Sequence, residues 1–265
     1  MQTLVFLKLG GSLITDKDQE RTPRLEVIQR LAGEIAEARI AQPDLQLLIG
    51  HGSGSYGHTA ARKYNTRSGV DSQLEWMGFA KVWYQARALN QIVLEKLVAA
   101  GLPVVAFPPS AFMLAQNSQA LPPETHHLKA ALANGLVPLV NGDAVFDSVL
   151  GGTILSTEDV FAALAPALQP ARILLAGIET GVYTDFPTCL HLAPYITPFT
   201  MQSMDNQIRG SVSIDVTGGM RQKVERMLSL SQQIPGLEAL IFSGLEPGNL
   251  RASLLGNQPG TRIHS

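Results

Sequence analysis

Six short apolar runs, separated by glycine turns and helical patterns, constrain the fold of this chain more than any other feature. Each run is hydrophobic on both faces, which is typical of a strand buried inside a parallel sheet. Two long stretches between them, residues 25–40 and 74–100, have the apolar spacing of helices. The repetition of strand, helix and strand predicts an α/β sandwich with a mostly parallel sheet, whose ligands bind at the carboxyl ends of the strands. The predicted strands are residues 3–9, 45–49, 103–107, 136–140, 171–177 and 237–242.

Composition excludes several classes of protein. The chain has 265 residues, 45% of them hydrophobic, enough for a large core in one domain or two lobes. With 20 basic and 22 acidic residues and no basic cluster on a predicted face, we expect no nucleic acid partner. No apolar stretch approaches the length of a membrane span, and we expect no membrane contact. The single cysteine, Cys189, excludes an internal disulfide framework, and a cytoplasmic protein is expected.

The loop after the first predicted strand, KLGGSLITDK, has the composition of a phosphate cradle. Gly10 and Gly11 allow backbone N–H groups to approach an anion closely, and the ammonium of Lys8 neutralises its charge. Lys17 follows nine residues after Lys8, far enough to curl round the loop and point back at the same site. The spacing matches neither GxxxxGK followed by Ser or Thr nor GxGxxG, which argues against those two nucleotide-binding folds. Taken alone, the loop is equally well explained by two solvated lysines beside a turn.

The second glycine loop, GHGSGSYGH at residues 50–58, follows the next buried strand and therefore faces the same edge of the sheet. Two glycine loops at one site suggest two phosphates. His51, next to the strand end, is favoured as a structural hydrogen-bonding residue over a ligand-binding one. A helix beginning near Thr59 would hold the imidazole of His58 against a phosphate, and a histidine pKa near neutrality allows a charged or a neutral donor.

Two further loops place charged side chains at the same edge. Asp143 follows a predicted strand, and Asp159 lies near the start of the next helical pattern. Buried carboxylates here would orient the lysines or help hold magnesium, although Asp159 is equally well explained as a charge at a helix N-terminus. In IDVTGGMRQK, Gly218 and Gly219 open a helix that presents Lys223 one turn later, which predicts another anion site.

The order of these loops along the chain resembles the amino acid kinase superfamily over nearly its full length. The segments are KLGGSLITDK, GHGSGSYGH, NGDAVFD, STED and DVTGGMRQK, and their order is more specific than any one of them. Within the superfamily the chain looks most like the isopentenyl phosphate kinases, which carry a histidine at the end of the glycine loop and DVTGGM before a lysine. The fosfomycin kinases are similar and share that histidine, so the histidine alone does not choose between them.

The resemblance implies a three-layer αβα sandwich with a mostly parallel central sheet, formed as a single domain of residues 1–265. Its first half, about residues 1–170, would bind the phosphoryl acceptor, and its second half, about 171–265, would bind ATP with magnesium. The implied reaction is the ATP-dependent phosphorylation of isopentenyl phosphate, a prenyl phosphate, to isopentenyl diphosphate by a homodimer. Two alternatives stay open: a kinase for another small phosphate or phosphonate such as fosfomycin, and a nucleotide-binding regulator without activity on the same fold.

The resemblance also implies roles for individual residues. Lys8 and Lys17 would contact the transferring phosphoryl group, with Lys17 stabilising its charge as it moves. Asp159 would orient Lys8, with Lys223 as a second candidate partner. The other implied contacts are those of Gly10, Gly11, Ser12, Tyr183, Gly219 and Lys223 with ATP, of Gly52, Ser53 and Gly54 between the two substrates, and of Gly57, His58 and Asp143 with the acceptor.

The chain departs from the family pattern at two positions. Glu179 stands where many members carry an aspartate, and Ser53 stands where the loop of many members has a glycine. The contacts implied at Glu179 are therefore open, and the hydroxyl of Ser53 adds a polar group near the phosphates. Residues 179–216, which are short of apolar runs and rich in Pro, Thr and Tyr, predict hairpins or loops over the site.

The helical stretch after the second loop carries the expected wall for the acceptor. Trp76, Phe79, Ala80 and Trp83 recur at spacings of three and four residues, which puts them on one face. Such a stripe is more often a core contact against the sheet. Both tryptophans of the chain fall on it, however, and a five-carbon prenyl tail needs an apolar wall beside its phosphate, whereas an antibiotic phosphonate needs polar partners. The pattern therefore favours isopentenyl phosphate over fosfomycin.

Overall fold

The computed structural model describes residues 3–185, 188–204 and 219–265, apart from the side chains of residues 58–60, 62, 63, 203 and 204. Its centre is an eight-stranded sheet in the order β12-β14-β13-β11-β1-β4-β8-β5. Every neighbouring pair is parallel except β13 with β14. The strands are β1 (Thr3–Leu9), β4 (Leu45–His51), β5 (Val104–Ala106), β8 (Val137–Asn141), β11 (Arg172–Gly177), β12 (Tyr195–Ile196), β13 (Glu238–Ser243) and β14 (Gly260–Ile263).

All six apolar runs of the sequence are strands of this sheet, so that part of the prediction is confirmed. The two long helical patterns are confirmed as α2 (Leu25–Ala41) and α4 (Gln73–Ala99). α4 begins with a capping box, in which the side chains of Ser72 and Glu75 each accept the other's backbone N–H. The cap explains why this helix starts sharply after a stretch that has no regular structure.

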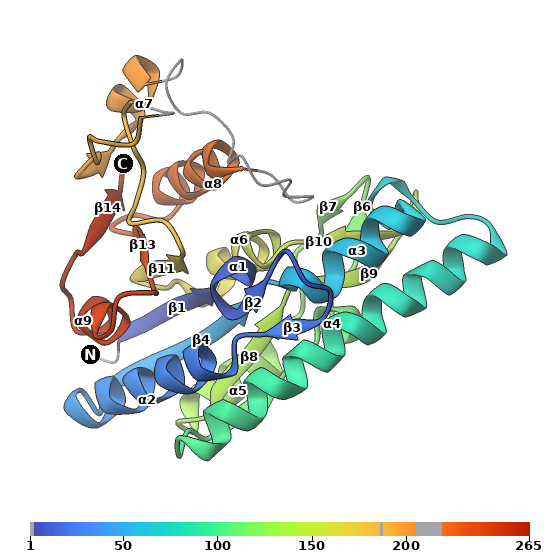
Figure 1. Ribbon diagram of the computed structural model, residues 1–265, viewed down its shortest axis with the longest axis horizontal. Coiled ribbons are helices and arrows are strands. Elements are labelled where there is room, and N and C mark those ends of the chain that lie inside the picture. The colour runs from blue at the N-terminus through green and yellow to red at the C-terminus, as the bar shows by residue number, and fades with distance from the viewer. Residues whose placement is uncertain (1–2, 186–187, 205–218) are drawn as a thin grey trace.

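Helices cover both faces of the sheet (Figure 1). The helices besides α2 and α4 that do so are α5 (His126–Ala133), α6 (Thr157–Leu168), α8 (Met220–Gln233) and α9 (Asn249–Leu254). Because alternate residues of a strand point to opposite faces, Phe6 of β1 packs on Phe161 of α6 with 5.1 Å between ring centroids. Val5 and Leu7 belong to the core on the other face, with α2, α4 and α9, whereas α5 and α8 share the first face with α6. The three-layer αβα sandwich is therefore confirmed.

The two halves of the chain build opposite ends of the sheet. β5, β8, β4 and β1 come from residues 1–170, and β11, β13, β14 and β12 come from residues 171–265. β1 and β11 pair in parallel between them. The assignment of the acceptor to one half and ATP to the other stays a prediction.

Smaller elements gather around the carboxyl ends of the central strands (Figure 1). These smaller elements are α1 (Gly11–Ile14), β2 (Thr15–Asp16), β3 (Thr22–Pro23), α3 (Gly54–Tyr64), η1 (Thr66–Ser68), η2 (Pro109–Ala111), β6 (Ala115–Gln116), β7 (Gln119–Ala120), β9 (Asp143–Asp147) and β10 (Gly151–Leu155). Of these, β9 and β10 pair as a hairpin and belong with β6 and β7 to a four-stranded sheet. In the region predicted as hairpins or loops, the described residues form a bridge between Tyr183 and Leu192, β12, and α7 (Pro198–Met204). No helix within the described ranges is long and apolar enough to cross a membrane.

The helix after the second glycine loop begins earlier than predicted. α3 starts at Gly54, so Gly54 and Gly57 are helical rather than part of a loop that ends near Thr59. Glycine disfavours a helix interior by about 1 kcal/mol relative to alanine. Here the missing side chain is required, because a Cβ on Gly57 would lie 2.4 Å from Ser53 Oγ and one on Gly54 would lie 2.1 Å from the hydroxyl of Thr15. Tertiary packing therefore overrides the low helix propensity of these residues.

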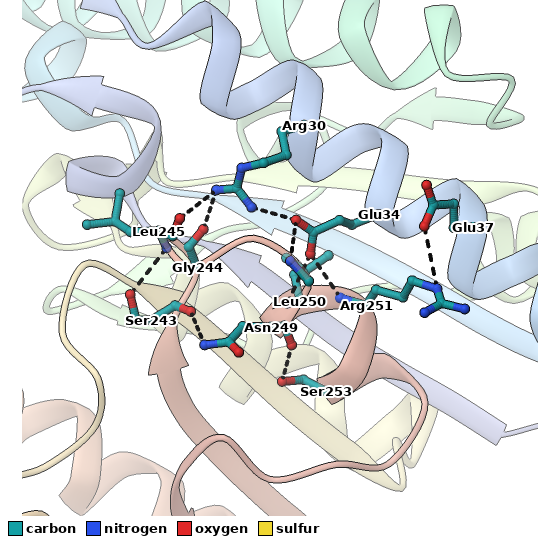
Figure 2. A network of polar contacts seen from close by, with 11 residues as sticks. Arg30, Glu34, Glu37, Ser243, Gly244, Leu245, Asn249, Leu250, Arg251 and Ser253 are labelled. Atoms are coloured by element: carbon teal, nitrogen blue, oxygen red, sulfur yellow. Dashed lines mark hydrogen bonds and ion pairs between the residues drawn. The ribbon is translucent and has the colours of Figure 1, made fainter.

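A buried carboxylate ties the C-terminal part of the chain to α2 (Figure 2). Glu34 of α2 accepts the backbone N–H groups of Gly248, Leu250 and Arg251 at the start of α9, which has no side-chain cap of its own. Arg30, one turn earlier on α2, donates to Glu34 and to two backbone carbonyls just after β13. Side chains of α2 therefore cap α9 and hold the segment that leads into it.

Replacing Glu34 with glutamine is expected to lower the free energy of unfolding by about 1–3 kcal/mol, because an amide offers one acceptor oxygen and no charge for Arg30. Urea denaturation followed by circular dichroism measures this change. Glu37→Gln on the same helix is the matched control: Glu37 pairs with Arg251 at 3.5 Å in an exposed position. Such pairs contribute about 0–1 kcal/mol. Equal losses in the two variants would contradict the capping role of Glu34.

Candidate active site

The carboxyl ends of β1, β4 and β11 open into one pocket. Its walls come from the loops after these strands, from the turn between β10 and α6, and from the first turn of α8. Segments far apart in the sequence therefore meet where an open parallel sheet binds its ligands. Of the predicted site residues, the pocket is lined by Lys8, Gly10, Gly11, Ser12, Lys17, Gly52, Ser53, Gly54 and Lys223. Lining residues that were not predicted as site residues include Gly142, Ile154 and Glu158.

The two glycine loops touch each other through their backbones. A Cβ on Gly11 would lie 2.6 Å from the backbone nitrogen of Gly54, and one on Gly52 would lie 2.8 Å from the nitrogen of Gly11. Contacts this close leave no room for a side chain at either position. Gly10 donates its own N–H to the carbonyl of Ala176 at 2.8 Å, so it contributes close approach to β11 rather than a donor to the pocket. The loops after β1 and β4 thus form one continuous surface of backbone.

A buried glutamate interacts with two of the lysines. Glu158, in the first turn of α6, is 6% exposed and forms an ion pair with Lys8 of β1. Burial by itself raises the pKa of Glu158, but the positive charges of Lys8 and Lys223 outweigh it, and the pKa lies below its ordinary value. Glu158 is therefore a carboxylate at neutral pH, and its negative charge interacts with those of Lys8 and Lys223.

Asp159, which was predicted to orient Lys8, is engaged elsewhere. Its Oδ2 accepts the backbone N–H of Ser156 at 2.7 Å in a capping box, and its Oδ1 pairs with Arg226 of α8. It lines a separate groove between α6 and α8. Successive residues of a helix point about 100° apart, so the two neighbouring carboxylates face different surroundings. The predicted contact between Asp159 and Lys8 is therefore wrong: the preceding residue, Glu158, forms the ion pair with Lys8.

Two more lysines reach the pocket from other elements. Lys17 lies on the segment that joins β2 to β3. Lys223 lies early in α8, whose N-cap is Gly219, as the sequence predicted. Gly218 lies outside the described residues. Ammonium groups from three different segments therefore converge on one space, which attracts anions such as phosphates.

His51 has the structural role that was favoured. Its ring is fully buried, with Asn90 of α4 donating to Nε2 at 3.0 Å and Nδ1 donating to the carbonyl of Gly52 at 3.0 Å. Burial lowers the pKa of His51 to about 4, so the ring is neutral at pH 7. His51 therefore supports the glycine loop from behind. The side chain of His58 lies outside the described residues, and its contact with an acceptor stays a prediction.

Asp143 lies behind the pocket rather than on its surface. It is 3% exposed and accepts the backbone N–H of Ser110 at 3.1 Å and that of Ala144 at 3.0 Å. Burial raises the pKa of Asp143 to about 6, although the bonds from Ser110 and Ala144 and the charge of Arg87 lower it. Its neighbour Gly142 lines the pocket instead. The direct contact predicted between Asp143 and the acceptor's phosphate does not agree with this position.

Asp143 is expected to make folding less favourable as the pH rises from about 4 to about 6. In this window the folded protein keeps a proton that the unfolded chain, with an ordinary pKa of 3.8, has released. Above this pH window, the loss of folding free energy caused by ionising the buried Asp143 approaches about 3 kcal/mol, since each pKa unit corresponds to about 1.4 kcal/mol. In Asp143→Asn this titration is absent. The unfolding free energy of the variant relative to the wild type should therefore rise with pH.

Urea denaturation of both proteins at a series of pH values between 4 and 8 measures this difference. His51 titrates in the same range with the opposite sign, because its lowered pKa makes the unfolded chain the form that holds the proton below pH 6.5. That contribution is common to both proteins and cancels. The hydrogen bonds that asparagine loses add a constant offset. A difference that does not change with pH would contradict the buried, titrating carboxyl.

An aromatic cluster adjoins the pocket through Ile154. Trp76 and Phe79 of α4 pack with Phe146 of β9, at ring-centroid distances of 5.3 to 6.0 Å. Ile154 packs against the same core cluster and also lines the pocket. Trp83 instead donates from Nε1 to a serine hydroxyl of η2 at 2.9 Å and is 39% exposed. The residues of the predicted face therefore have different surroundings. Trp76 and Phe79 pack behind Ile154 of the pocket wall, whereas Trp83 contacts η2 and lies away from the pocket.

The whole arrangement matches a known family. Residues 3–243, from β1 to the end of β13, match the amino acid kinase family. The chain belongs to the amino acid kinase family. Members of this family use ATP, which agrees with a pocket of lysines and glycine loops.

Several relatives in the amino acid kinase family align with almost the whole chain. The isopentenyl phosphate kinase of Methanothermobacter thermautotrophicus is 34% identical over 98% of each chain. The isopentenyl phosphate kinase of Methanocaldococcus jannaschii is 30% identical, again over 98% of each chain. A solved structure of an isopentenyl phosphate kinase superposes with a TM-score of 0.83 at 31% identity, covering 98% of this chain and 99% of the other. The superposition shows that this solved structure and the chain share their fold.

The segment after β11 contributes Glu179 rather than Tyr183 to the pocket of this amino acid kinase. Ile178 and Glu179 line it, whereas Tyr183 forms its bridge with Leu192 and is not among the lining residues. Glu179, where the family pattern has an aspartate, thus keeps a carboxylate at the pocket. The contact of Tyr183 with a nucleotide stays a prediction.

Magnesium was predicted together with ATP, and protein side chains are one way to hold such an ion. In the ranges that the structure describes, no group of three or more His, Cys, Asp or Glu side chains could hold a metal ion. Among the described residues, two carboxylates line the pocket, those of Glu158 and Glu179, and Glu158 is paired with Lys8. A magnesium site built from protein side chains alone therefore does not fit these residues.

Proposed function

We propose that this chain catalyses the ATP-dependent phosphorylation of isopentenyl phosphate to isopentenyl diphosphate. The observation that carries the proposal is the convergence of Lys8, Lys17 and Lys223 in one pocket with Glu158, beside two glycine loops in backbone contact. A kinase whose acceptor is itself a phosphate must bring two anionic groups together, and such a site neutralises them. Relatives that align over 98% of the chain carry this activity in their names, which supports the choice. We also propose a homodimer, which light scattering in solution tests.

In the proposed reaction a phosphate oxygen of the acceptor attacks the γ-phosphorus of ATP, forming one P–O bond while the bond to ADP breaks. The acceptor oxygen is already a nucleophile, so catalysis depends on alignment and charge neutralisation rather than on a covalent intermediate. Lys8 and Lys17 contact the transferring group, and Lys223 contacts the phosphates of the nucleotide. Glu158 holds Lys8 in place through their ion pair. Magnesium, carried by the phosphates of ATP, adds positive charge when bound.

The acceptor's tail is proposed to lie against Ile154, which is backed by the aromatic cluster of Trp76, Phe79 and Phe146. These side chains belong to α4, β9 and β10; Ile154 lines the pocket, and the three aromatic rings pack together next to it. A hydrocarbon tail gains from removal of apolar surface from water, whereas a small polar phosphonate does not. The wall therefore favours a prenyl phosphate.

A coupled assay for ADP with a panel of acceptors tests the proposal. Isopentenyl phosphate, dimethylallyl phosphate and fosfomycin are offered separately with saturating Mg-ATP. The highest kcat/KM with isopentenyl phosphate supports the proposal. Faster turnover of fosfomycin would assign the phosphonate reaction instead. Binding of ATP without turnover of any acceptor would assign a regulator without activity.

Replacing His58 with alanine is expected to abolish acceptor use while ATP binding is retained, because His58 is proposed to bind the acceptor's phosphate. Steady-state kinetics and calorimetric titration with Mg-ATP measure the two effects separately. His126→Ala is the matched control, since the His126 side chain is 93% exposed at the start of α5. Normal turnover of isopentenyl phosphate by His58→Ala would leave His58 with a structural role only.

A further inference from the structure

An ion pair between Asp159 of α6 and Arg226 of α8 lies outside the pocket, and the proposed reaction does not use it. The side chain of Asp159 is 13% exposed and that of Arg226 is 33% exposed, so the pair is partly shielded from water. Asp159 is held from its own side as well, because its Oδ2 accepts both the N–H of Ser156 at 2.7 Å and the Ser156 hydroxyl at 2.6 Å. The carboxylate therefore presents its other oxygen to Arg226 in a fixed direction.

The same two helices also approach each other inside the pocket. Glu158, the residue before Asp159, faces Lys8 and is close enough to Lys223 for the charge of that lysine to act on it. Lys223 precedes Arg226 by three residues on α8, which places both on the same side of that helix. The charge of Glu158 also acts on Arg226, so charges link the first turn of α6 to the first two turns of α8 at both Lys223 and Arg226.

Apolar contacts also join the two helices. Val224 and Met227 are fully buried and share a core cluster with Phe161 and Leu164 of α6. Such contacts hold the helices together, but they lack the directionality of a hydrogen-bonded ion pair. The ion pair is directional instead: Nη1 of Arg226 meets Oδ1 of Asp159, whose Oδ2 is held by Ser156, so the pair sets direction and register. Lys223 and Arg226 are about 4.5 Å apart along the axis of the same helix, so a shift of α8 along its axis moves both residues by the same amount.

We propose that Arg226 is a positioning residue: its ion pair with Asp159 fixes α8 against α6 and so places the ammonium of Lys223 at the phosphates of ATP. This inference rests on the proposed function in one respect, the role of Lys223 at the nucleotide. Arg226 itself contacts neither substrate. Its effect passes through the position of Lys223.

The central test is Arg226→Gln, assayed by calorimetric titration with Mg-ATP in the absence of any acceptor and by steady-state kinetics. We expect Mg-ATP binding to weaken by about fivefold or more and kcat to fall by about tenfold or more. KM for the acceptor should stay within about twofold, because its proposed wall belongs to other elements. Arg226→Lys, which keeps the charge but not the guanidinium, should recover part of both losses.

Asp159→Asn breaks the pair from the other side without removing the cap. The amide oxygen of asparagine still accepts from Ser156, and its NH2 group faces Arg226, where it repels rather than attracts. This variant should lose Mg-ATP binding to the same degree as Arg226→Gln. The double variant should be no worse than either single one, since both remove the same interaction. Glu225→Gln, which breaks the exposed pair of Glu225 with Arg221 on the same helix, is the control and should bind Mg-ATP normally.

The outcomes separate this inference from the proposed function. If the wild type turns over none of the acceptors, the proposed function fails, while the titrations with Mg-ATP still test the positioning role. Wild-type binding and turnover in both Arg226→Gln and Asp159→Asn would overturn the inference and leave the function standing. Additive losses in the double variant, or an equal rise in KM for the acceptor, would also overturn it, because they indicate general loosening. Thermal melts confirm that each variant is folded at the assay temperature.

Discussion

Replacing Lys17 with alanine is expected to lower kcat by about 100-fold or more, with little change in KM for ATP. Lys17 reaches the pocket from the segment between β2 and β3, apart from the elements that carry Lys8 and Lys223. If Lys17 stabilises charge only while the phosphoryl group moves, its loss affects the transition state and not the bound nucleotide, so kcat and kcat/KM fall together. Steady-state kinetics with ATP and isopentenyl phosphate varied in turn give these constants.

A second lysine provides the control for this experiment. Lys129 is exposed on α5 and lies beside Leu4 and Gln46, at the amino ends of β1 and β4 and therefore at the opposite edge of the sheet. Lys129→Ala removes the same charge from the molecule and should leave both constants within about twofold. A raised KM for ATP at unchanged kcat in Lys17→Ala would place Lys17 on the ground-state nucleotide. Near-normal turnover would remove Lys17 from the site.

The strands and the two long helices could be predicted because their signal is local. In TLVFLKL the apolar residues fill both faces of β1, and no surface element tolerates that pattern. The order of the strands could not be predicted in the same way. Nothing within β1 indicates that it lies between β11 and β4, since that order depends on how the helices pack on both faces of the sheet.

The start of α3 shows where local propensity fails. Glycines at 54 and 57 predict a loop, yet both are helical, because only a residue without a side chain fits between the loop after β1 and Ser53. A sequence alone does not reveal such tertiary contacts. The same limit applies to Phe146, whose part in the aromatic cluster depends on β9 lying under α4.

The sequence contained the information needed to choose Glu158 rather than Asp159 as the partner of Lys8. Ser156 and Asp159 have the spacing of a capping box, which commits Asp159 to the helix N-terminus. The neighbouring Glu158 is then the acidic residue available to the pocket. The loop sequences therefore identified segments that meet in one pocket, and the side-chain contacts within it depended on hydrogen bonds that a motif does not show.

Glu158→Gln is expected to lower kcat/KM by about 100-fold. The change removes the negative charge beside Lys8, whose side chain is 11% exposed, and so removes what orients that ammonium. Misplacement of a catalytic group by about 1 Å costs on the order of 100-fold in rate. Glu158→Asp keeps the charge on a shorter side chain and should give an intermediate rate. The assay is steady-state kinetics at a temperature well below the unfolding transition of each variant.

Stability as a function of pH separates a local role of Glu158 from loss of the fold. Because Lys8 and Lys223 hold the pKa of Glu158 below its ordinary value of 4.5, its stabilising contribution is present above that pH. The contribution is lost as the pH falls through the folded-state pKa. Wild type and Glu158→Gln should therefore differ in unfolding free energy at pH 7, and the difference should narrow as the pH falls below 4.5. Lost activity with no such difference would confine the role of Glu158 to the transition state. Retention of both activity and stability would show that Lys8 and Lys223 keep their places without it.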